Sequence, residues 1–164
     1  MEMPVFTIRG KNHRERGVDY GVQCKELIQG VLERYIRFFN GGHTAVSWDE
    51  AKVISKEFLP FIRSYSPELL DELEGIAQGA DVEFDDLLTL NSRSEAMTLV
   101  RRPPSDKEEL DGCSSVAVLP DASANGHTIL AQNWDTYTWQ EYGTVILQIL
   151  RDDGPDLMIV TEAG

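Results

Sequence analysis

The stretch CSSVAVLPDASANGHTILAQNWD, residues 113–135, predicts two antiparallel strands joined by a turn. Its ends, 113–120 and 128–135, are apolar and rich in β-branched and small residues, which favours strands. Between them, Asn125-Gly126 is a pair typical of β-hairpin turns, because both residues tolerate positive φ. Two later apolar segments, 143–150 and 157–164, predict further strands. We therefore expect residues 113–164 to form an antiparallel meander.

The chain before this stretch has helical periodicity from residue 12 to residue 100. Apolar residues between Val18 and Phe39 recur at intervals of three and four, which predicts one amphipathic helix. The sequence SWDE at 47–50 is a capping box and predicts the start of a second helix. Ser66-Pro67 predicts the start of a third, and the segment 83–97 predicts a fourth.

Glycine spacing adds one packing prediction. Gly17 and Gly21 lie four residues apart on the first predicted helix. Because glycine lowers helix stability, the pair indicates that another backbone approaches closely there.

The predicted fold class is α+β within one structural domain, with a helical part at 1–112 and the start of an antiparallel sheet at 113–164. Residues 100–112 contain two adjacent prolines and many charges, so we expect an exposed loop. The last apolar strand ends at Gly164 with no later element to cover the sheet. We therefore expect an incomplete sheet, which a second chain could complete.

Composition limits the class of protein. The 164 residues are 41% apolar and 26% charged, which is typical of a globular chain. The formal net charge of −13 disfavours nucleic acid and anionic membranes as partners. No apolar run has the length of a membrane span, and the N-terminus lacks the pattern of a signal peptide. With only two cysteines, we expect reduced thiols and a cytoplasmic location.

Cys113 lies at the junction between the charged loop and the first predicted strand. A cysteine with an ordinary pKa near ~8.5 is mostly thiol at neutral pH, so a nucleophilic role requires a base. His13, His43 and His127 have no catalytic spacing, but a cut after Gly112 would create an α-amine with a pKa of roughly 7.7–8.0. The alternative is a small residue buried at the start of a strand, and position alone favours this alternative.

Four segments together resemble the acyl-coenzyme A:6-aminopenicillanic acid acyltransferase family. This family is peptidase family C45, within the N-terminal-nucleophile hydrolase superfamily. The segments are GIAQGADVEFDDLLTLNSRSE at 75–95, DGCSS at 111–115, AQNWD at 131–135 and TEAG at 161–164. The resemblance extends over nearly the whole chain but only over the N-terminal portion of such a family member.

The resemblance implies a role for each matching residue. Self-cleavage at Gly112 would make Cys113 the N-terminal nucleophile, and Asp135 would contact the new amine and the thiol. Asn133 and Trp134 would support the end of that strand. Without the resemblance, the sequence favours a simpler role for Asp135, in which its side chain caps a turn.

The implied fold is a four-layered αββα sandwich with the helical segment outside it. Arg93 and Glu95 would support the site or form a buried structural pair near it. Gln132 departs from the related bile-salt hydrolases, which have arginine at this position, and the family's downstream asparagine and arginine have no counterpart in this sequence.

The predicted function is that of a self-processing cysteine amide hydrolase or acyltransferase. Its substrate would be a small acyl amide or acyl thioester, attacked through a thioester acyl-enzyme. The sequence contains no metal-ligand cluster and no nucleotide motif, so we expect no cofactor. The alternative is a non-catalytic fragment or a subunit that completes its sheet with another chain.

Overall fold

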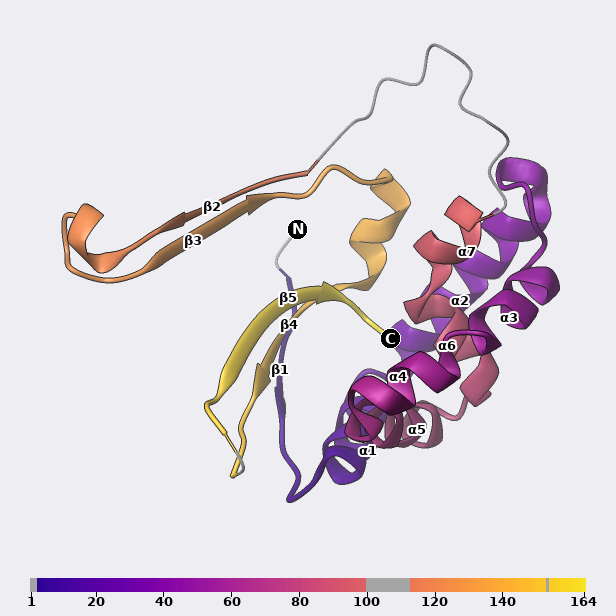
Figure 1. Ribbon diagram of the computed structural model, residues 1–164, viewed down its shortest axis with the longest axis horizontal. Coiled ribbons are helices and arrows are strands. Elements are labelled where there is room, and N and C mark those ends of the chain that lie inside the picture. Colours follow the sequence, from indigo (N-terminus) through magenta and orange to yellow (C-terminus); the bar gives the residue numbers. More distant parts are fainter. Residues whose placement is uncertain (1–2, 100–112, 153) are drawn as a thin grey trace, which may run out of the picture. The chain divides into compact units, whose positions relative to one another are not determined.

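A computed structural model describes residues 3–99, 113–152 and 154–164, and Figure 1 shows its elements. The chain divides into two compact units. The larger unit comprises Met1–Arg102 with Gln140–Gly164, and the smaller comprises Pro103–Trp139. The predicted loop at 100–112, and Gly112 with it, lies outside the described residues.

Helices make up most of the larger unit. In chain order they are α1 (His13–Gln23), α2 (Lys25–Phe38), α3 (Trp48–Lys56), α4 (Leu59–Tyr65), α5 (Pro67–Ala80), α6 (Phe84–Asn91) and α7 (Arg93–Leu99). A π-helical turn, η1 (Phe39–His43), follows α2. The helical conformation ends at Gly42, whose φ is +80°.

Three of the predicted helices are each broken into two. The predicted first helix is interrupted at Cys24 and the fourth at Ser92, where φ and ψ leave the helical range. At Ser92 the side-chain hydroxyl and the backbone N–H both donate to the carbonyl of Leu88, an arrangement that bends helices. The prediction of continuous helices was wrong, because apolar periodicity continues through such breaks.

The predicted helix starts are confirmed. The Ser47 hydroxyl caps α3 by accepting from the backbone N–H of Glu50, whose carboxylate accepts from the backbone N–H of Ser47. Ser66 is the N-cap of α5, with Pro67 at its first position. The capping box marks the start of α3, whereas the Ser66 side chain makes no capping bond and Pro67 at the first position marks the start of α5.

The predicted close approach at Gly17 and Gly21 is also confirmed, and α5 is the partner helix. A Cβ added at Gly17 would lie 2.1 Å from the carbonyl oxygen of Glu72. On the opposite helix, a Cβ added at Gly75 would lie 2.3 Å from the carbonyl oxygen of Arg14. The two backbones therefore touch at the crossing, where no side chain would fit.

A three-stranded sheet lies beside the helices (Figure 1). Its order is β1 (Val5–Ile8), β4 (Thr144–Ile149), β5 (Leu157–Glu162), with β1 parallel to β4 and β4 antiparallel to β5. The sequence predicted β4 and β5 but not β1. A single antiparallel meander was the wrong prediction, because β1 pairs in parallel with a strand that is about 140 residues away in the sequence.

The core of the larger unit lies between the helices and one face of this sheet. It contains Ile8 of β1, Val145 and Leu147 of β4, and the inward residues of α2 at the helical spacing of Ile28, Val31, Leu32 and Tyr35. On the face away from the helices, Val5, Met158 and Val160 are exposed.

The smaller unit contains the hairpin predicted from residues 113–135. Strand β2 (Ser114–Val118) pairs antiparallel with β3 (Ile129–Asn133), and the connection contains the short 3-10 helix η2 (Pro120–Ala122). Gly126 has a φ of +71°, which favours glycine, but Asn125 does not have positive φ and the connection spans residues 119–128. The pair therefore belongs to a longer connection and does not form a two-residue hairpin turn. A second 3-10 segment, η3 (Thr138–Gly143), precedes β4.

The mixture of helix and sheet fits the predicted α+β class, while the αββα sandwich remains a prediction. Within the described ranges, no helix combines the length and the apolar character that crossing a membrane requires.

Candidate functional site

The predicted site residues of the smaller unit meet at the open end of the β2–β3 hairpin. Ser114 pairs with Asn133 in the strand register, so Cys113 and Asp135 extend from the same end of the two strands. The thiol of Cys113 lies 3.8 Å from the backbone carbonyl oxygen of Asp135 and is directed to it as a weak donor. The strand pairing therefore brings together residues that are 22 positions apart.

Asn133 fixes the carboxylate of Asp135. The side-chain Nδ2 of Asn133 donates to both carboxylate oxygens of Asp135, at 3.0 and 3.1 Å. Trp134, between them, is 38% exposed. The arrangement is an exposed thiol that contacts the backbone of Asp135, whose carboxylate the side-chain amide of Asn133 holds in place.

The two thiols of the chain have opposite environments. Cys113 is exposed, whereas Cys24 is 1% exposed in the packed interior between α1 and α2. Burial, with a smaller contribution from the charge of Asp19, raises the pKa of Cys24 to about 12. Cys24 is thus an inert packing residue at neutral pH, and Cys113 is the accessible thiol.

Arg93, the third predicted support residue, belongs to a polar network in the larger unit. Its Nη2 donates to Oε2 of Glu162 at 2.9 Å, and its Nη1 donates to the carbonyl of Leu90 at 2.6 Å. The guanidinium also lies over the ring of Tyr35, 4.7 Å from its centroid. Arg93 is therefore paired with Glu162 rather than with Glu95, which is exposed.

The same network extends through the hydroxyl of Tyr35. Tyr35 donates to Oε2 of Glu162 at 2.8 Å and accepts from Nε2 of Gln140 at 2.5 Å. Burial of Tyr35, together with the negative charge of Glu162, raises the pKa of the phenol, although Arg93 acts in the opposite direction. The phenol is consequently a neutral hydrogen-bond donor to the carboxylate.

Glu162 is the centre of this network and was not predicted as a site residue. It is 7% exposed, and its second oxygen, Oε1, has no hydrogen-bond partner among the described residues. The signal in the sequence was the TEAG segment at 161–164, which contains Glu162. Its partners Tyr35 and Gln140 carry no comparable signal, because Tyr35 belongs to the apolar face of a predicted helix and Gln140 lies among aromatic residues outside any motif.

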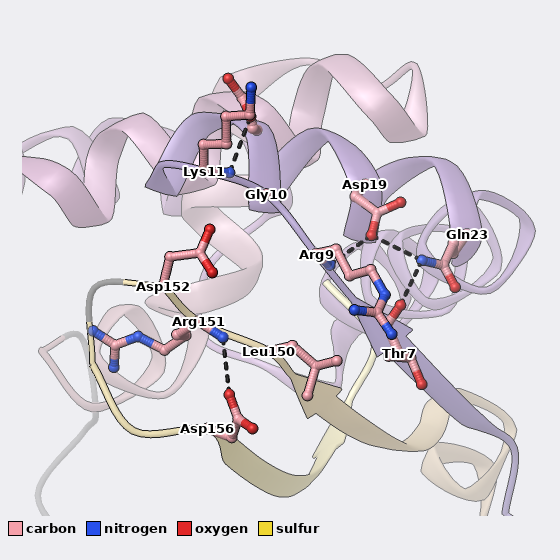
Figure 2. A pocket seen from close by; sticks show the side chains of 11 residues that line it. Thr7, Arg9, Gly10, Lys11, Asp19, Gln23, Leu150, Arg151, Asp152 and Asp156 are labelled. Carbon is pink, nitrogen blue, oxygen red and sulfur yellow. Dashed lines mark hydrogen bonds between the residues drawn. The ribbon is translucent and has the colours of Figure 1, made fainter.

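A separate open cleft of 790 Å³ lies between the start of α1 and the end of β4 (Figure 2). Its carboxylates accept from the backbone: Asp19 from the N–H of Arg9 at 2.7 Å, and Asp156 from the N–H of Arg151 at 3.0 Å. Asp19 also accepts from the side chain of Gln23 at 3.0 Å, and Gln23 donates to the carbonyl of Thr7 at 2.9 Å. These bonds hold in place the residues that lead from β1 into α1 and the turn that follows β4.

The described residues contain no cluster of side chains suited to a metal ion. Across residues 3–99, 113–152 and 154–164, no three side chains of His, Cys, Asp or Glu are arranged to hold a metal ion.

Among the known proteins that are similar to this chain are two enzymes, whereas no family model matches the chain. The chain is 30% identical over 151 residues to the 40 kDa form of acyl-coenzyme A:6-aminopenicillanic-acid-acyltransferase from Emericella nidulans, a match that covers 89% of this chain and 39% of that protein. It is 28% identical over 158 residues to the beta-alanyl-dopamine/carcinine hydrolase of Drosophila melanogaster, covering 92% and 38%. The chain thus spans about two fifths of the length of these curated relatives.

Proposed function

We propose that this chain is the N-terminal portion of an acyl-transferring amide hydrolase of the acyl-coenzyme A:6-aminopenicillanic acid acyltransferase family, and that Cys113 is its nucleophile. The observation that carries the proposal is the exposed thiol of Cys113 next to the Asn133–Asp135 pair at one end of the hairpin. Both similar proteins are named as enzymes that transfer or hydrolyse acyl groups, which supports the same class of reaction.

The nucleophile is produced by a cut between Gly112 and Cys113. The Cys113 sulfur attacks the carbonyl carbon of Gly112, and the C–N bond breaks as a thioester forms. Water then hydrolyses this thioester, leaving a carboxylate on Gly112 and a free thiol and α-amine on Cys113. The α-amine, with a typical pKa of roughly 7.7–8.0, is the base that the thiol otherwise lacks.

In the catalytic reaction, the α-amine of Cys113 takes the thiol proton and the thiolate adds to the carbonyl carbon of an amide or thioester substrate. The tetrahedral intermediate collapses, the ammonium returns its proton to the leaving amine or thiol, and a thioester acyl-enzyme remains. Water or an acceptor amine then attacks this thioester, releases the acyl group and regenerates the thiol.

Asp135 orients the base in this scheme. Its carboxylate, held by Asn133, is suited to accept a hydrogen bond from the α-ammonium group that forms when the thiol loses its proton. The proposed substrates are small molecules with an acyl group on nitrogen or sulfur, the class to which the names of the similar proteins point. The αββα sandwich would be the fold of the whole protein.

A second candidate function is that of a non-catalytic subunit that completes its sheet with another chain. The observation in its favour is the exposed apolar face of the larger sheet, formed by Val5, Met158 and Val160. A chain with this function would associate in solution and would not react with acyl substrates through Cys113.

Covalent labelling tests the leading proposal. The protein is incubated with an aryl thioester of a short fatty acid, and the acyl group is located by peptide mass spectrometry. We expect one added acyl group on Cys113, on its sulfur or transferred to its α-amine, that is absent in Cys113→Ala and retained in Cys24→Ser, the matched control with a buried thiol. Equal labelling of Cys113→Ala would contradict the proposal.

A further inference from the structure

The polar network around Glu162 connects two parts of the chain that lie on opposite sides of the proposed cut. Tyr35 and Arg93 belong to residues 3–99, whereas Gln140 and Glu162 belong to residues 140–164. After a cut at Gly112–Cys113, each of these three hydrogen bonds would join two separate polypeptides.

The surrounding contacts also join these two parts. Strand β1 pairs in parallel with β4, and backbone hydrogen bonds join the two at both ends of β1. The N–H of Ile146 donates to the carbonyl of Pro4 at 2.9 Å, and the N–H of Leu150 donates to the carbonyl of Ile8 at 3.0 Å. The backbone N–H of Gly164 donates to the hydroxyl of Tyr20 at 2.9 Å. The N-terminal part is therefore an integral part of the sheet and the core.

We propose that Glu162 is the residue by which the C-terminal fragment, beginning at Cys113, recognises and retains the N-terminal fragment after the cut. The partner is thus residues 1–112 of this chain as a separate polypeptide, and its recognition elements are the hydroxyl of Tyr35 and the guanidinium of Arg93. This inference rests on the proposed function, because the fragments exist only if the cut occurs.

The chemistry of the network suits recognition. One carboxylate oxygen accepts from two donors of the other fragment, and these donors are the buried Tyr35 and the partly buried Arg93, whose side chain is 23% exposed. If the fragments separate, Glu162 regains water, but Arg93 and Tyr35 lose a fixed acceptor and the core opens. Removal of one partner in such a pair leaves the other buried without compensation, which increases the dissociation rate.

The two oxygens of the Glu162 carboxylate differ, because Oε2 is hydrogen-bonded and Oε1 has no donor among the described residues. A buried acceptor without a donor costs free energy, so the favourable contribution of Glu162 comes from its other oxygen, Oε2. Both donors to Oε2 belong to residues 3–99, so this favourable contribution depends on the N-terminal fragment being in place.

The test separates recognition from self-cleavage. In a Cys113→Ala background, which cannot cut itself in the proposed way, a site for an added protease replaces residues 105–110, and the folded chain is cut with that protease. Exchange of the N-terminal fragment against its isotope-labelled copy is then followed by native mass spectrometry. The variants are Tyr35→Phe and Glu162→Gln, and the controls are Tyr65→Phe and Glu141→Gln, which alter exposed side chains.

We expect exchange at least about tenfold faster in Tyr35→Phe and in Glu162→Gln, and within about twofold of the parent in both controls. The double variant should exchange more slowly than the product of the single effects predicts, because both changes remove the same hydrogen bond. Parent-like exchange in both test variants would overturn the proposal, as would immediate separation of the parent fragments. Tyr35→Phe removes a single oxygen atom, so it keeps the test valid if Glu162→Gln fails to fold. Failure of the natural chain to cut itself would be detected by its intact mass. It would not change the exchange rates, because the added protease makes the cut in that experiment.

Discussion

The crossing of α1 and α5 gives a prediction with a magnitude that follows from the structure. In Gly17→Ala, the new methyl carbon would lie 2.1 Å from the carbonyl oxygen of Glu72, whereas ordinary contact begins at 3.4 Å. The backbones would have to separate by 3.4 − 2.1 = 1.3 Å. Overpacking against a rigid neighbour costs about 1–3 kcal/mol, and this site belongs at the upper end because the obstacle is backbone.

A compensating gain must be subtracted. Alanine is favoured over glycine inside a helix by about 1 kcal/mol, so the net loss of unfolding free energy is about 2 kcal/mol. For a chain of this size, each kcal/mol lowers the melting temperature by about 2–4 °C, which gives a decrease of about 4–8 °C. The measurement is thermal unfolding followed by circular dichroism.

The matched control is Gly41→Ala. There, the nearest atom to an added Cβ is the His43 side chain at 3.2 Å, and the residue is exposed. We expect a change within about 0.5 kcal/mol. If Gly17→Ala melted at or above the temperature of the parent protein, the close backbone crossing would be refuted.

Four further predictions concern the two thiols, the two residues of the capping box and the carboxylate of the site. Iodoacetamide at pH 7.5 should alkylate Cys113 and leave Cys24 intact until the chain unfolds; early labelling of Cys24 would show that its burial is wrong. Ser47→Ala should lower the unfolding free energy by about 1 kcal/mol in a urea titration. Hydrogen bonds from Ser47 lower the pKa of Glu50 below its ordinary value of 4.5, so the stability that Glu50 adds is present above pH 4.5 and is lost as the pH falls through the lowered value. The stability difference between the parent and Glu50→Gln should therefore vanish in acid, and a difference independent of pH would contradict the capping box. Asp135→Asn should slow acylation of Cys113 about tenfold to a hundredfold in a stopped-flow assay, because it removes a charge-assisted hydrogen bond to the base, and an unchanged rate would remove Asp135 from the mechanism.

Local features of the fold were predictable from the sequence. The capping box at Ser47 and the positive φ of Gly126 are each determined by residues within a few positions, and the spacing of Gly17 and Gly21 marks a close approach without identifying α5 as the partner. In such cases a side chain or a backbone angle has a direct local consequence, so the pattern of residues is sufficient.

Long-range pairing was not predictable in the same way. Strand β1 has four residues, and it is a strand because it pairs with β4, which lies about 140 positions later in the sequence. The separation of the strands into two sheets likewise depends on which strands meet, a property that no apolar pattern carries.

The candidate site contains residues of both kinds: some are identified by a local motif, and others only by contacts that are distant in the sequence. Cys113 and Asp135 were identified through motifs, and hairpin pairing brings them together with Asn133. Glu162 acquires its importance only through contacts with Arg93 and Tyr35, from helices distant in the sequence. The predicted partner for Arg93 was Glu95, two residues away, but residues two apart on a helix do not face one another.

The most direct test of the central claim is intact-mass analysis of the purified full chain, combined with N-terminal sequencing of the products. We predict two fragments whose masses add up to that of the chain plus one water, with the second fragment beginning at Cys113. Cys113→Ala should remain a single intact chain, and Cys24→Ser should be cut like the parent. An uncut parent chain, or a cut at another bond that persists in Cys113→Ala, would contradict the account.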